Sequence, residues 1–193
     1  MDNKKLQQFI YSCQRASLCF HFNNRDGIIE FMERLEDKPY LAVLCQQKNL
    51  LTRFGSGVCL TMSSWVFDLL YSMDADNYYL MESRNSYWSN FVILFEVNGE
   101  YRICDFAAEV RKNEELIDDL FDAEEDEVLK IHKELKTPCN LNMTIEEYTE
   151  RYPIAYCNVI QHKGHENDLY YDVPRIKLKD FLENVKEKKT PQV

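Results

Sequence analysis

The sequence predicts an α+β fold in which a cysteine-bearing helix packs on a small antiparallel sheet. Two observations support this prediction. Residues 58–70 form a nearly all-round apolar helical run directly after Gly55 and Gly57. Helical spacing then gives way to the apolar run 91–97, which is followed by Asn98-Gly99, the strongest short hairpin signal. With 193 residues, 45% of them apolar, the chain is long enough for a full core, and we expect a single domain over 1–193.

The N-terminal part, residues 1–53, is expected to be helical. Apolar residues in 4–20 recur at helical spacing, with polar residues on the other side. A second helix is predicted over 26–36 and ends before Pro39. A further short helix is predicted over 40–52, and it leads to the turn at Gly55 and Gly57.

The core is expected over residues 54–109, where Cys59 opens the central helix. Unpaired N–H groups and the positive end of the helix dipole favour thiolate over thiol at such a position. The alternative is that Cys59 packs as a small apolar residue, as buried cysteines commonly do. The sheet should contain a short strand at 78–80 and a hairpin of 91–97 and 100–106, with the first hairpin strand central and covered on both faces.

Residues 110–152 are predicted to form an acidic helical excursion. Acidic residues crowd 114–127, but apolar residues still recur at helical spacing, which indicates an amphipathic segment. Its charged side is either a solvated face or a docking surface for a basic partner. Thr144 and Glu147 match a capping signal for a short helix that runs to Tyr152.

The C-terminal part, residues 153–193, is expected to hold strands and a last helix. A strand is predicted over 154–160, followed by a loop with His162 and His165. Residues 169–173 are a candidate return strand, and the last helix is predicted to begin at Asp180.

Composition excludes several classes of function. A net charge of −10 leaves no basic stripe for nucleic acid or an anionic membrane, so the expected partner is a protein, a peptide or an acyl substrate. No apolar run reaches the ~18 residues of a membrane span, and no signal-peptide core follows Met1. Seven cysteines in apolar contexts suit a reducing, cytoplasmic environment.

No cofactor is expected, and neither candidate metal set has a convincing spacing. Cys19 and His21 form a single C-x-H fragment without a second pair. A C-terminal set matches no common zinc ribbon or finger: Cys139, Cys157, His162 and His165.

Residues 54–109 resemble the transglutaminase-like and arylamine N-acetyltransferase-like branch of the papain-like cysteine enzymes. The resemblance rests on the helix-borne Cys59, the apolar strand, the turn, and the return strand that ends in Asp105. It implies a papain-like fold and a Cys-His-Asp triad in which the histidine takes the thiol proton and the aspartate orients it. The histidine position falls on Asn90, in Trp88-Ser89-Asn90-Phe91-Val92.

Asn90 cannot act as a general base, because its amide does not ionise near neutral pH. Three explanations stay open: a degenerate site, a histidine supplied from elsewhere, such as His162 or His165, or a parent sequence with histidine at position 90. The sequence thus leaves two hypotheses. The first is a thiol enzyme acting on amide or acyl groups by hydrolysis, deamidation or acyl transfer, with Cys59 as nucleophile and Asp105 as orienter. The second is an inactive relative that binds or inhibits another protein through its acidic surface.

Overall fold

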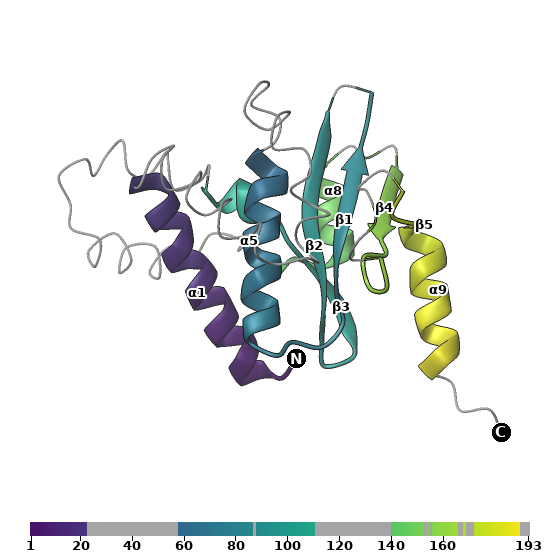
Figure 1. Ribbon diagram of the computed structural model, residues 1–193, viewed down its shortest axis with the longest axis horizontal. Helices are drawn as coiled ribbons and strands as arrows, with labels where there is room; N and C mark the ends of the chain where they lie inside the picture. The colour runs from purple at the N-terminus through teal and green to yellow at the C-terminus, as the bar shows by residue number, and fades with distance from the viewer. Residues whose placement is uncertain are drawn as a thin grey trace.

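The computed structural model describes residues 1–22, 58–86, 88–110, 140–152, 154, 156–165, 168 and 172–189. The helices predicted over 26–36 and 40–52 and the acidic segment 111–136 lie outside these residues. The described part is a mixed helix and antiparallel-sheet structure, so the α+β class is confirmed (Figure 1).

Within the described residues, the sheet has five strands in the order β3-β2-β1-β4-β5. The strands are β1 (Tyr78–Arg84), β2 (Ser89–Val97), β3 (Glu100–Cys104), β4 (Tyr156–Ile160) and β5 (Arg175–Lys177). Every neighbouring pair is antiparallel. The sheet is therefore a meander of three strands that is extended at β1 by the C-terminal part of the chain.

The predicted hairpin is present between β2 and β3. Asn98 (φ 50°) and Gly99 (φ 88°) both adopt the left-handed backbone that a two-residue turn of this kind needs. Val92, Ile93 and Leu94 are fully buried, so β2 is covered on both faces as predicted. The return strand is shorter than predicted and ends at Cys104, because the chain turns into a helical segment at Phe106.

Successive residues of β2 point to opposite faces, and each face has its own core. We call the first the α5 face. Its cluster contains Ile93 and Phe95 together with residues of α1 (Asn3–Phe22) and α5 (Val58–Ser72). The second, the α8 face, carries Val92 and Leu94. Figure 1 shows α1 and α5 side by side and α8 behind the strands.

Among the described elements, two helices pack on the α8 face: α8 (Ile145–Arg151) and α9 (Leu178–Lys189). Helix α8 begins with the predicted capping box: Thr144 accepts a hydrogen bond from the Glu147 N–H, and the Glu147 carboxylate accepts one from the Thr144 N–H. Both backbone groups would otherwise lack a partner inside the helix. The capping box thus fixes where the chain leaves the sheet edge and turns.

Two predictions about strands need correction. Strand β1 continues four residues beyond Leu80, because Met81 and Ser83 are buried and pair with both neighbouring strands. Strand β4 pairs with β5; of the predicted return strand 169–173, residues 172–173 form a turn and a bend, and 169–171 lie outside the described residues. Helix α9 begins at Leu178, two residues earlier than predicted.

Candidate functional site

Two of the three residues of the expected triad meet in a buried polar cluster on the α8 face. The Asn90 side-chain amide donates to the Asp105 carboxylate at 3.1 Å. It also lies 3.4 Å from the hydroxyl of Tyr148, which is 2.7 Å from the hydroxyl of Ser83. We call Ser83, Asn90, Asp105 and Tyr148 the polar cluster; all four are buried.

Hydrogen bonds of both its backbone and its side chain hold Asp105 in place. Its N–H donates to the Asn140 carbonyl at 2.7 Å, and its carboxylate accepts from the Ala108 N–H at 3.0 Å. The second contact caps the helical segment 106–110. One carboxylate oxygen therefore caps the helical segment, the other accepts from the Asn90 amide, and the backbone N–H anchors the end of the strand to Asn140.

The polar cluster lacks the proton acceptor that the family's chemistry needs at position 90. Asn90 is an amide. Burial is the main cause that raises the pKa of Tyr148, with the nearby Asp105 adding to it, so its hydroxyl keeps its proton at neutral pH. Neither side chain can take a proton from a thiol under these conditions.

Cys59 lies elsewhere, as the second residue of α5. It is 9% exposed and belongs to the same cluster as Ile93 and Phe95 on the α5 face. Asn90 shares the other face with Val92 and Leu94, because side chains alternate along β2. The structure therefore brings Asn90 and Asp105 together, but it places Cys59 on the opposite side of the sheet.

Helix α5 is tied to the sheet one turn after Cys59. The Ser63 hydroxyl donates to the Phe91 carbonyl at 2.6 Å. The indole of Trp65 stacks on Phe106 with ring centroids 5.3 Å apart. These contacts fix where α5 lies along the strands of the sheet. They therefore also fix the position of Cys59 at the start of this helix.

The structure places His162 against α5 and His165 in the loop after β4. His162 packs edge-on against Phe67, with ring centroids 4.4 Å apart. Phe67 follows Cys59 by eight residues on α5, which is ~12 Å along a helix axis. His165 pairs with Asp168. The His162 contact on α5 therefore lies about two helical turns beyond Cys59.

Burial sets the properties of Cys13, Cys104 and, to a smaller degree, Cys157. Cys13 and Cys104 are both fully buried. Burial is the main cause that raises the pKa of Cys104 well above that of a free thiol. Burial also raises the pKa of Cys157 to about 11. The described residues contain no group of three or more side chains suited to hold a metal ion.

Sequence reasoning missed two members of the polar cluster. Ser83 lies in β1 beyond the predicted strand 78–80. Tyr148 was placed on the correct short helix, but sequence spacing alone does not show which tyrosine of that helix points to the sheet. The available signal was the capping box, which fixes Tyr148 one turn after the cap residue Thr144.

Comparisons of the chain with protein-family models, with curated proteins and with solved structures find no match. Within the described ranges, no helix is long and apolar enough to cross a membrane.

Proposed function

We propose that this protein has no catalytic triad of the transglutaminase-like kind and that it acts by binding another protein. The observation that supports this most is the hydrogen bond from the Asn90 amide to Asp105. In the family that the chain resembles, a histidine occupies this position and carries the proton. Here the aspartate orients an amide, which has no proton-transfer chemistry near neutral pH.

The surroundings of this pair favour a structural role for it. Asn90 and Asp105 are both buried. The Asn90 side-chain amide contacts Asp105 and Tyr148, its backbone carbonyl accepts from Ser83, and the Asp105 carboxylate also accepts from the Ala108 N–H. A satisfied polar network in a core makes one arrangement of the strands and helices preferred. The polar cluster would then hold β1, β2, β3 and α8 in a fixed relation, as a binding scaffold requires.

A protein partner fits the charge of the chain. The net charge of −10 repels polyanions and attracts basic surfaces. A partner with a basic face is therefore the class that the composition favours, and its association should weaken as salt is added.

Catalytic silence is tested with acyl donors. The purified chain is incubated with p-nitrophenyl acetate and, separately, with a glutamine-containing peptide plus an amine, and intact mass is followed. We expect no stoichiometric acyl adduct on Cys59 and the same background turnover for the chain and for Cys59→Ala. A Cys59 acyl adduct, together with turnover that Cys59→Ala abolishes, would overturn the proposal.

One observation favours thiol chemistry as a second candidate. Cys59 stands at the N-terminal end of a fifteen-residue helix and retains 9% exposure, and helix N–H groups stabilise a thiolate there. This candidate requires a base other than Asn90. Alkylation of Cys59 as a function of pH separates the two candidates, because a paired thiolate reacts well below the ordinary thiol pKa near ~8.5.

A further inference from the structure

The turn between β2 and β3 carries a chemically labile pair of residues that the proposed binding function does not use. Asn98-Gly99 is the one Asn-Gly pair in the sequence, and both residues are exposed. Asparagine is a thermally labile residue, and a glycine after it leaves the next backbone nitrogen without a side chain to shield it. The turn is therefore a candidate site of spontaneous deamidation.

Deamidation at such a pair needs water but no enzyme or cofactor. The Gly99 backbone nitrogen loses its proton and bonds to the side-chain carbonyl carbon of Asn98, and the side-chain nitrogen leaves as ammonia. Water then opens the resulting cyclic imide at either of its carbonyl carbons. The product is aspartate or isoaspartate, and each conversion consumes one water and releases one ammonia.

The folded turn holds the reacting atoms apart. Asn98 (φ 50°) and Gly99 (φ 88°) both have positive φ, as in a type I′ turn. In that turn type the first residue has ψ of about +30°, which places the next backbone nitrogen almost opposite to Cβ across the Cα–C bond. Ring closure needs this nitrogen on the same side as Cβ, because both atoms belong to the ring. The turn must therefore open before Asn98 can react.

Two contacts with the start of α1 add to this restraint. The Asn98 side-chain amide donates to the Asn3 side-chain oxygen at 3.0 Å, and the Asn98 N–H donates to the Met1 carbonyl at 3.2 Å. The first contact holds the amide nitrogen, which is the leaving group, and the second holds the backbone of the same residue. The rate of reaction at Asn98 should thus depend on α1 as well as on the hairpin.

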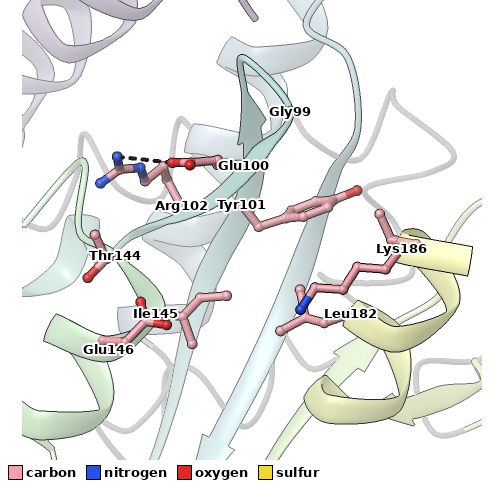
Figure 2. Close-up of a pocket in the computed structure, with 10 residues that line it drawn as sticks. Gly99, Glu100, Tyr101, Arg102, Thr144, Ile145, Glu146, Leu182 and Lys186 are labelled. Atoms are coloured by element: carbon pink, nitrogen blue, oxygen red, sulfur yellow. Dashed lines mark ion pairs between the residues drawn. The ribbon is translucent and has the colours of Figure 1, made fainter. Parts of the chain in front are cut away.

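Water has access to the turn from the side of β3. Gly99 lines a pocket of about 390 Å³, together with Glu100 and Tyr101 of that strand (Figure 2). Asn98 itself is exposed. Hydrolysis of the cyclic imide is therefore not limited by burial, and the conformation of the turn is what controls the reaction.

We propose that Asn98 is a site of spontaneous deamidation that the folded hairpin and its contacts with α1 keep slow. Isoaspartate adds one carbon atom to the backbone of a two-residue turn, which disturbs the pairing of Val97 with Glu100. Either product replaces the side-chain amide with a carboxylate, which cannot donate to Asn3. Deamidation is thus an irreversible change that weakens the docking of α1 on the hairpin.

The test follows conversion at Asn98 by peptide mass spectrometry in the full chain, kept at pH 8 either folded or in urea. In urea, we expect Asn98 to convert faster than every other asparagine. In the folded chain its conversion should be at least about tenfold slower, because only molecules with an open turn react. No conversion at Asn98 in urea would overturn the site, and equal rates in the two states would overturn its protection by the fold.

Two variants test the contact with α1. Asn3→Ala should raise the folded-state rate at Asn98 about two- to tenfold, which is the factor that one exposed hydrogen bond is worth. Lys4→Ala changes an exposed neighbour on α1 and should leave the rate unchanged. Conversion at Asn85, whose side chain accepts from the Trp88 N–H, reports general unfolding and should keep the parent rate in both variants. A joint rise at Asn98 and Asn85 in Asn3→Ala, or no rise at Asn98, would overturn the role of this contact.

Discussion

Tyr148→Phe is the substitution that probes the polar cluster with the least change in shape. The side chain is fully buried, and its hydroxyl is 2.7 Å from Ser83 and 3.4 Å from Asn90. Removing the hydroxyl deletes both contacts. Asn90 keeps its bond to Asp105, but Ser83 is left with a 3.5 Å contact to the Asn90 carbonyl.

The expected cost follows from which groups lose partners. A typical internal hydrogen bond contributes ~1 kcal/mol net, and a buried hydroxyl left poorly paired costs ~1–3 kcal/mol. Because Ser83 retains a weak acceptor, we expect the free energy of unfolding to fall by ~1–2 kcal/mol. For a chain of this length the melting temperature should fall by ~2–8 °C.

Urea denaturation followed by tryptophan fluorescence measures this change. Tyr156→Phe is the matched control, because Tyr156 is 40% exposed and lies outside the polar cluster. Its effect should stay within ~0.5 kcal/mol of zero. If Tyr148→Phe costs no more than the control, the polar cluster does not stabilise the fold in the way that we argue.

Three further predictions concern single groups. Burial raises the pKa of Cys157 from 9.0 to about 11, so at pH 8 this thiol should carry about a hundredfold less thiolate than an ordinary thiol. Its alkylation by iodoacetamide, resolved by residue, should be slower by a similar factor, and a rate equal to that of a model thiol would contradict this. Thr144→Ala removes half of the capping box and should cost ~1 kcal/mol of unfolding free energy, measured by urea denaturation, whereas Thr149→Ala on the exposed side of α8 should cost clearly less. The pKa of Tyr148 is raised above its ordinary 10.0 in the folded chain, so above pH 10 the tyrosine ionises more readily in the unfolded chain than in the folded one. The free energy of unfolding should therefore be unaffected by this group below pH 10 and should decline as the pH rises further. Tyr148→Phe should reduce that decline.

The sequence predicted those parts of the fold that depend on local signals. Asn98-Gly99 fixed the hairpin because both residues accept positive φ. Thr144 and Glu147 fixed the start of α8, because their side chains and backbone groups satisfy one another. The contact between Asn90 and Asp105 followed from the same hairpin, since the register of β2 against β3 sets which residues meet.

The face on which each side chain lies was harder to predict. A shift of one residue reverses the face of every side chain in a strand, so Asn90 could be assigned to the correct strand without showing whether it points toward α5. The strand β5 was missed because three residues carry little pattern of their own. Its pairing with β4 depends on long-range packing, which single-sequence periodicity does not report.

The central claim is that the Asn90–Asp105 pair lies away from Cys59 and has no part in thiol chemistry. The most direct measurement is the pH profile of Cys59 alkylation by iodoacetamide, resolved by peptide mass spectrometry, in the parent chain and in Asn90→His. We predict that the two profiles coincide and inflect not far below the ordinary thiol value of ~8.5, because an imidazole at position 90 would face Tyr148 and Asp105. An acidward shift of one unit or more in Asn90→His, partly reversed by adding Asp105→Asn, would show a thiolate–imidazolium pair and contradict the account.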